Sequence, residues 1–128
     1  MTKYLFDTHI FLWAFDNHPK LSAEARYLLG EYDKELYFSP VSVWEVATKA
    51  STKHPLGISA EEFRQHVLEG GFREMPITSA HAALVETLPH HHEDPFDRML
   101  VAQAMAEGCI LVTHDDHLPA YGAFVKRV

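Results

Sequence analysis

A short, continuous apolar run, Cys109-Ile110-Leu111-Val112, is the feature that most restricts how this chain can fold. A strand with successive apolar residues is buried on both faces, which is typical of a parallel sheet covered by helices. Apolar runs at Tyr4–Phe6 and Leu36–Phe38 are likewise followed by segments with helical patterns. This alternation predicts the α/β class: a mainly parallel sheet of four to five strands sandwiched by helices, with right-handed crossovers.

Turn and capping residues indicate where these elements begin and end. Ser39-Pro40 and Asp94-Pro95 each have the pattern of an N-cap followed by proline at the first helical position. Ser59 and Glu62 have the spacing of a capping box. The expected strands are Tyr4–Phe6, Leu36–Phe38, Phe72–Ile77, Cys109–Val112 and Ala123–Val125, and the expected helices are Ile10–Phe15, Ala23–Gly30, Pro40–Ala50, Ser59–Glu69, Ala80–Leu88 and Pro95–Gly108.

Size and composition indicate one globular domain, residues 1–128. Hydrophobic residues make up 47% of the chain, enough for a packed core. The single cysteine, Cys109, excludes an internal disulfide framework and suits a reducing compartment. No apolar run approaches the roughly 18 residues of a membrane span, so we expect a cytoplasmic protein outside the membrane. The net charge of −7 excludes a generally basic nucleic-acid-binding protein, although it permits basic side chains around an acidic site.

Four acidic residues are expected to meet at one edge of this sheet. Asp7 directly follows the first strand, and Asp115 lies three residues after Val112, beyond the fourth. Glu45 lies between one and two turns into the helix that leaves the second strand, and Asp97 lies in the first turn of the helix that returns to the fourth. All four positions therefore fall near the carboxyl ends of the strands, where sheets of this kind bind their ligands.

A cluster of carboxylates favours a particular chemistry. Carboxylates held close together repel one another, and their pKa values rise unless a positive group lies between them. A hard divalent cation with oxygen ligands, Mg²⁺ or Mn²⁺, removes this repulsion. Such a cation lowers the pKa of a bound water and stabilises a leaving oxygen, which suits phosphodiester hydrolysis.

Each of these acids also has a purely structural interpretation. Asp7 has the position of an N-cap, and Asp97 complements the positive end of a helix dipole. Glu45 has the spacing of an exposed ion pair with Lys49, which is worth only about 0.2–0.5 kcal/mol. Asp115 has the position of a turn residue. No single position is specific for metal binding, whereas the convergence of all four is.

Four segments of the sequence resemble, in order, the PIN-domain nucleases, and especially the VapC-type toxins of prokaryotic toxin–antitoxin pairs. The segments are Asp7–Trp13 (DTHIFLW), Ser39–Lys49 (SPVSVWEVATK), Asp94–Ala104 (DPFDRMLVAQA) and Leu111–Asp115 (LVTHD). The resemblance covers essentially the whole chain. The helix that begins at Asp94 and the Val-Trp-Glu helix make it specific.

The resemblance implies a five-stranded parallel sheet and a Mg²⁺- or Mn²⁺-dependent endoribonuclease. It also implies a homodimer, an RNA substrate and a small antitoxin that plugs the acidic site. Asp7, Glu45, Asp97 and Asp115 fall on the acidic positions of the family, both as metal ligands and as catalytic residues. Thr113 falls on the position of a small hydroxyl residue beside the last acid, where it would orient water or a ligand.

Two acids near these positions leave the assignment open. Asp116 adjoins Asp115, so either of them is a candidate for the fourth acid. Asp94 lies close to Asp97, but it precedes Pro95 and so has the pattern of an N-cap rather than of a metal ligand.

Basic residues beside the acids are candidates for contacts with RNA phosphates. Lys49 and Arg98 adjoin the acidic positions, and Lys53 follows shortly after. Arg98 has the alternative of an ion pair with Glu93 or Asp94.

The histidines and tryptophans give weaker signals. His90-His91-His92 is expected to form a solvated loop, because three consecutive side chains do not all turn to one metal. His114 and His117 flank the fourth acid and could reach an RNA phosphate, but a surface position is the simpler expectation. Trp13 and Trp44 are expected to be core or dimer-face aromatics rather than base-stacking platforms.

Other classes of function fit the sequence less well. Phospho-acceptor receiver domains need a second acid beside the first strand and a lysine after a late strand, and Asp-x-Asp phosphatases need a second acid two residues on. Asp7-Thr8-His9 supplies neither acid, and the only late lysine, Lys126, is almost at the end of the sequence. The remaining alternative is a non-catalytic PIN-like scaffold that binds RNA or protein, and the complete set of four acids argues against it.

Overall fold

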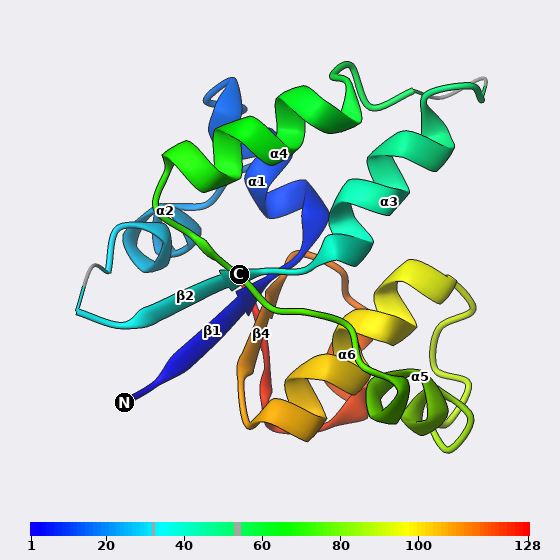
Figure 1. The fold of residues 1–128 in the computed structure, drawn as a ribbon. Coiled ribbons are helices and arrows are strands. Elements are labelled where there is room, and N and C mark those ends of the chain that lie inside the picture. The colour runs from blue at the N-terminus through cyan, green and yellow to red at the C-terminus, as the bar shows by residue number, and fades with distance from the viewer. Residues whose placement is uncertain (32, 53–54) are drawn as a thin grey trace.

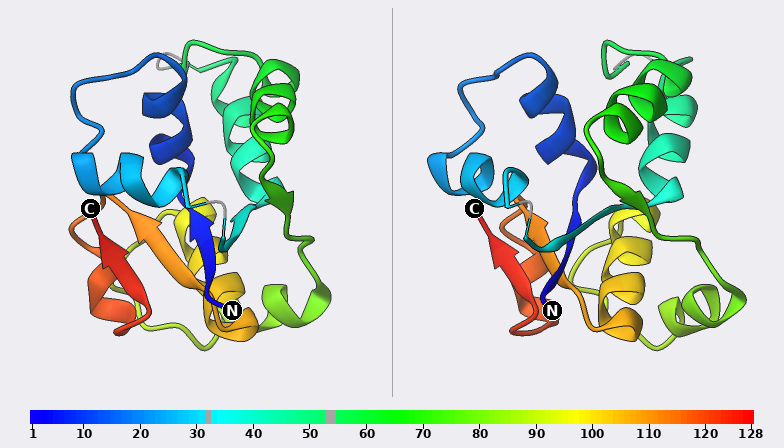
Figure 2. Two further views of the ribbon diagram at one scale, coloured as in Figure 1. Left: turned by 90° about the vertical axis from the view of Figure 1, so that its left-hand side faces the viewer. Right: turned by 60° about the vertical axis from the view of Figure 1, so that its left-hand side comes forward.

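The computed structural model describes residues 1–31, 33–52 and 55–128, which form a parallel sheet covered by helices on both faces (Figure 1, Figure 2). The strands of the described chain are β1 (Lys3–Phe6), β2 (Glu35–Phe38), β3 (Arg73–Glu74), β4 (Ile110–Thr113) and β5 (Val125–Arg127). The helices are α1 (Thr8–Phe15), α2 (Ala23–Leu29), α3 (Pro40–Lys49), α4 (Ala60–Glu69), α5 (Ser79–Val85), α6 (Pro95–Glu107) and the 3₁₀ helix η1 (Leu118–Tyr121). All four strand pairs are parallel, which confirms the predicted α/β class.

The sheet separates two hydrophobic cores, because successive residues of a strand point to opposite faces. Leu5 and Leu111 pack on the side of α5 and α6. Their neighbours Phe6 and Val112 pack on the side of α1, α2 and α4. All four side chains are fully buried. The central strands are therefore apolar at every position for the reason inferred from the sequence.

The edge strands differ from the sequence expectation. Only Arg73–Glu74 form β3, whereas a strand over Phe72–Ile77 was expected. The ring of Phe72 packs into the aromatic core beside β1 and α1, and Pro76 has no N–H to donate to a ladder. At the other edge, β5 lies slightly later in the chain than expected.

Short polar side chains cap the helices. Ser39 accepts the N–H of Val41, and Ser59 accepts the N–H of Glu62, as their positions predict. Among the described helices, both bonds of a capping box occur at Thr78 and His81 of α5 rather than at Ser59. No helix in the described residues is long and apolar enough to cross a bilayer.

The strand order creates a crevice in the middle of the sheet. The order is β3-β2-β1-β4-β5, so the chain builds outward from β1 in one direction and then returns to β4 on its other side. Connections leave β1 and β4 in opposite directions at this switch point, and α/β proteins bind ligands there, beyond the carboxyl ends of the strands. Asp7 directly follows β1, and Thr113 ends β4.

Candidate active site

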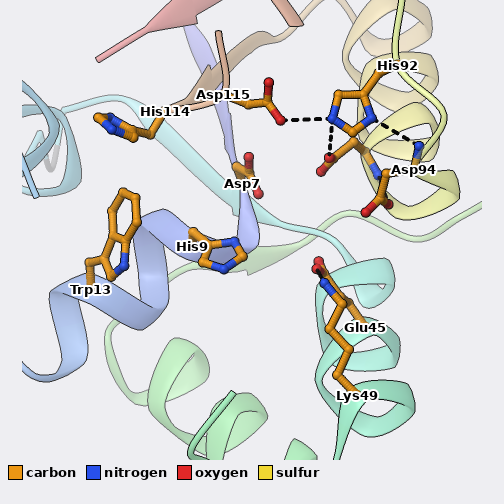
Figure 3. Close-up of a pocket in the computed structure, with 10 residues that line it drawn as sticks. Asp7, His9, Trp13, Glu45, Lys49, His92, Asp94, His114 and Asp115 are labelled. Atoms are coloured by element: carbon orange, nitrogen blue, oxygen red, sulfur yellow. Dashed lines mark hydrogen bonds and ion pairs between the residues drawn. The ribbon is translucent and has the colours of Figure 1, made fainter. Parts of the chain in front are cut away.

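An open cavity of about 360 Å³ lies at the carboxyl edge of the sheet (Figure 3). We call Asp7, Glu45, Asp97 and Asp115 the acidic cluster, and all four line this cavity. The remaining lining residues are His9, Trp13, Lys49, His92, Asp94 and His114. The structure thus brings together four acids that come from the end of β1, from α3, from the first turn of α6 and from the loop after β4.

Asp7 occupies the N-cap position of α1, but its side chain caps nothing. Its Oδ2 instead accepts a hydrogen bond of 2.7 Å from the hydroxyl of Thr113, so the N-cap position does not account for where this carboxyl points. The carboxyl is buried, and this burial raises its pKa, with a contribution from the charge of Glu45 that the bond from Thr113 opposes. Thr113 also accepts the N–H of Asp115 at 3.0 Å, so one hydroxyl ties two members of the acidic cluster together.

Glu45 forms the expected ion pair with Lys49, but the carboxylate is buried rather than exposed. Its Oε2 lies 2.5 Å from Nζ of Lys49, and the residue is only 3% exposed. Its other oxygen, Oε1, is the one buried side-chain polar atom in the described residues without a hydrogen-bond partner. Burial alone would lower the pKa of Lys49, but the bond to Glu45 and the charges of Glu45, Asp94 and Asp97 raise it.

Asp94 and Asp97 have separate roles at the start of α6. Asp94 is the N-cap, as expected, because Oδ1 accepts the N–H groups of Phe96 and Asp97. The carboxyl of Asp97 is also strongly perturbed. Burial, followed by the charges of Asp7, Asp94, Glu45 and Asp115, raises the pKa of Asp97 to about 9. Burial makes the largest contribution, and the remainder is the repulsion expected of clustered carboxylates.

Asp115 and Asp116 lie in different environments, although they are adjacent. Asp115 faces the cavity and contacts His92 and His117. Its burial opposes ionisation, but bonds from the backbone of His117 and from His92 outweigh this effect and lower its pKa. Asp116 is 76% exposed and pairs with Arg127 at 2.7 Å outside the cavity. The structure therefore places Asp115, and not Asp116, with the other three acids.

His92 is a cavity residue that the sequence reasoning missed. A solvated loop was expected for His90–His92, and this is wrong for His92. Its Nε2 lies 2.9 Å from Oδ2 of Asp115 (Figure 3). It also lies 3.4 Å from Oδ2 of Asp97. The available signal was its place two residues before the N-cap of α6, which puts it at the same edge of the sheet as Asp97.

Arg98 does not face the cavity, so its proposed contact with RNA is a wrong prediction. The side chain is buried, and among the described interactions it forms no ion pair with Glu93 or Asp94 either. Its guanidinium donates to the hydroxyl of Tyr121 and to the backbone carbonyls of Val85, Leu88, Pro89 and His92. Lys49 lines the cavity, and Lys53 lies outside the described residues.

Neither tryptophan is fully buried, although Trp13 packs against the core on the side of α1, α2 and α4. Trp13 is half-buried at the rim of the cavity, where its ring meets that of His114 edge to face at 5.0 Å. His114 is held by a bond from Nδ1 to the carbonyl of Val128. Trp44 is 58% exposed and packs edge to face on Phe96.

The donor atoms of the cavity fit a hard divalent cation. The acidic cluster offers carboxylate oxygens from four elements, the ligand type that Mg²⁺ and Mn²⁺ prefer. Oε1 of Glu45 is buried without a partner, and the pKa values of Asp7 and Asp97 are raised. A cation held by the acidic cluster would satisfy this oxygen and relieve the repulsion. Such an arrangement can activate water beside a phosphodiester.

The sequence and fold match known proteins closely enough to assign a family. A family model described as the PIN domain matches residues 4–123. A structure of VapBC2 from Rickettsia felis bound to a promoter DNA fragment is 14% identical, with a TM-score of 0.69 over 98% of each chain. A toxin–antitoxin complex from Klebsiella pneumoniae is 21% identical, with a TM-score of 0.67 over 98% of this chain and 99% of that one. VapBC-5 from Mycobacterium tuberculosis is 16% identical, with a TM-score of 0.65 over 100% of both chains. A comparison with curated proteins finds no match.

Proposed function

The chain belongs to the PIN domain family, and on that basis we propose that it is a Mg²⁺- or Mn²⁺-dependent endoribonuclease. Proteins with this domain are typically metal-dependent nucleases. The observation that carries the proposal is Oε1 of Glu45, which is buried without a partner in a cavity lined by three further acids of the cluster. Leaving a buried acceptor unpaired costs about 1–3 kcal/mol, and more for a charged group, so this oxygen is suited to a cation.

The residues of the cavity have different roles in the proposed reaction. The acidic cluster would hold the cation, which when bound lowers the pKa of a water and stabilises the leaving oxygen. Thr113 fixes the carboxylate of Asp7 and the backbone of Asp115. Lys49 keeps its positive charge beside Glu45 and would attract the phosphate group of an RNA strand.

We further propose that the protein is a cytoplasmic toxin that pairs with a small antitoxin and forms a homodimer. The similar structures named above are toxin–antitoxin complexes, which supports an antitoxin partner. The exposed ring of Trp44 supports a contact between copies, because a large aromatic side chain on the surface is typical of interfaces. The molar mass in solution, measured by light scattering, tests the dimer.

RNA cleavage in the presence and absence of metal tests the activity. We expect the purified protein to cleave RNA with Mn²⁺, to stop when EDTA is added, and to resume when Mn²⁺ is restored. Asp7→Asn is expected to abolish cleavage, while the matched surface variant Asp116→Asn retains it. Cleavage that persists in EDTA would contradict the proposal. Binding of RNA without any cleavage would instead indicate a scaffold.

A further inference from the structure

The loop between α5 and α6 places His92 beside the acidic cluster. Nε2 of His92 lies within reach of Asp97 at 3.4 Å and of Asp115 at 2.9 Å. These two acids come from different elements, the first turn of α6 and the loop after β4. The imidazole therefore bonds to Asp115 and lies close to Asp97, two members of the acidic cluster from different elements.

The hydrogen bonds of His92 fix which ring nitrogen carries the proton. Nδ1 accepts the backbone N–H of Asp94 at 3.0 Å. A backbone N–H is always a donor, so Nδ1 has no proton and the neutral ring carries it on Nε2. The group that faces Asp115 is consequently an N–H donor, and Figure 3 shows the two ring nitrogens of His92 directed at Asp115 and at the backbone of Asp94.

A buried arginine and a tyrosine hold the backbone on which this histidine lies. Arg98 donates to the carbonyls of Leu88 at 3.2 Å and Pro89 at 2.9 Å, and it also reaches the carbonyl of His92. The hydroxyl of Tyr121 accepts the N–H of His92 at 3.1 Å and a bond from Arg98 at 3.2 Å. Burying a guanidinium costs free energy unless its N–H groups find hydrogen-bond acceptors. Here they fix the segment that ends in His92.

We propose that His92 is a positioning residue of the metal site, and that Arg98 and Tyr121 hold it in place. Its Nε2–H holds the carboxylate of Asp115 by a hydrogen bond and lies beside that of Asp97, so that both stay turned toward the cavity in the orientation that receives a divalent cation. This inference rests on the proposed function, because it takes the acidic cluster as the metal ligands. Hydrogen-bond partners of metal-ligating carboxylates typically change metal affinity by about 10–100-fold when they are removed.

Direct ligation by His92 is the alternative, and the hydrogen bonds argue against it. Ligand atoms of His92, Asp115 and His117 all lie within 4.8 Å of one another, a set that would suit zinc or another transition metal. A metal on Nε2 needs the lone pair of that atom, which moves the proton to Nδ1. The proton would then face the N–H of Asp94, so ligation requires the loss of that bond.

Calorimetric titration with Mn²⁺ separates the two roles. Glutamine keeps a donor N–H near the place of Nε2 but has no imidazole lone pair, so we expect His92→Gln to bind Mn²⁺ nearly as tightly as wild type. His92→Ala should bind about 10–100-fold more weakly. The matched control is His90→Ala, since His90 belongs to the same histidine run but is exposed. Unchanged binding by His92→Ala would overturn the proposal, and equal loss in the Gln and Ala variants would make His92 a ligand.

Two further measurements guard against misfolding and test the tautomer. Tyr121→Phe leaves the imidazole and the acidic cluster in place but removes one anchor, and it should weaken Mn²⁺ binding in the same direction as His92→Ala. An unchanged affinity in this variant would remove Tyr121 from the proposal. Nitrogen NMR should show the proton on Nε2 of His92, both without metal and with Mg²⁺. A proton on Nδ1 would contradict positioning, whereas a wild-type protein that binds no Mn²⁺ at all would overturn the proposed function itself.

Discussion

Replacing Asp97 with asparagine should stabilise the metal-free protein. Asp97 lies in the acidic cluster, where burial and four neighbouring carboxylates raise its pKa from an ordinary 3.8 to about 9. In the absence of metal the folded state therefore binds a proton that the unfolded chain releases at neutral pH. Asparagine has nearly the same shape, carries no charge at any pH, and keeps an oxygen on the side of Nε2 of His92.

The size and direction of the effect follow from this pKa difference. Below pH 3.8 the carboxyl is protonated in both states, so it does not weaken the fold. As the pH rises from 3.8 toward the folded pKa of about 9, the free energy of unfolding of the wild type falls, because only the unfolded chain ionises freely. About three pKa units separate the ordinary value from pH 7, and each is worth about 1.4 kcal/mol, so the upper limit of the gain is about 4 kcal/mol. Water in the open cavity screens the charges and makes the measured gain smaller.

Urea denaturation in EDTA at several pH values measures this gain. The advantage of Asp97→Asn over wild type should grow as the pH rises from about 5 to about 8. The matched control is Asp116→Asn, whose exposed carboxylate lies outside the cavity and should produce little pH-dependent difference. A less stable Asp97→Asn variant, or a gain that does not change with pH, would refute the electrostatic reasoning.

Mn²⁺ should raise the melting temperature at neutral pH and do so less as the pH falls, because protons compete for the same carboxylates; equal gains at about pH 5 and about pH 8 would contradict this. Glu45→Gln should lower the single-turnover cleavage rate at saturating Mn²⁺ by at least about tenfold, or about 1.4 kcal/mol in the barrier. Lys49→Met should lower the cleavage rate less than Glu45→Gln does. A larger loss in Lys49→Met would remove Glu45 from the proposed metal ligands. Arg98→Met should lower the free energy of unfolding in urea by about 3 kcal/mol, since several buried carbonyls lose their donor. If Arg98→Met is instead as stable as wild type and binds RNA more weakly, Arg98 contacts RNA after all.

The position of the acidic cluster could be predicted because it depends on local signals and on one topological rule. Continuous apolar runs identify the buried strands, and the residues that follow a parallel strand meet at one edge of the sheet. Asp7, Glu45, Asp97 and Asp115 all lie close to such strand ends or to the helices beside them, and the structure brings them together. The N-cap role of Asp94 was predictable for the same reason, since it depends only on Pro95 and the helix that follows.

The roles of Arg98 and His92 could not be predicted from local patterns. Adjacent residues of a helix differ in direction by about 100°, so the neighbour of Asp97 does not share its face. The partners of Arg98 are mostly backbone carbonyls, which leave no trace in the side-chain sequence. The place of His92 depends on Tyr121, which lies 29 positions away in η1 and accepts the backbone N–H of His92. Three consecutive histidines have no periodicity that would distinguish the one that faces the cavity.

An anomalous diffraction map from a crystal soaked in Mn²⁺ tests most directly whether the acidic cluster is a metal centre. We predict manganese density inside the cavity, about 2.1 Å from carboxylate oxygens of the acidic cluster, with Nε2 of His92 still bonded to a carboxylate rather than to the metal. Density between His92 and His117, away from Asp7 and Glu45, would contradict the assignment. A cavity without manganese at a concentration that supports RNA cleavage would contradict it as well.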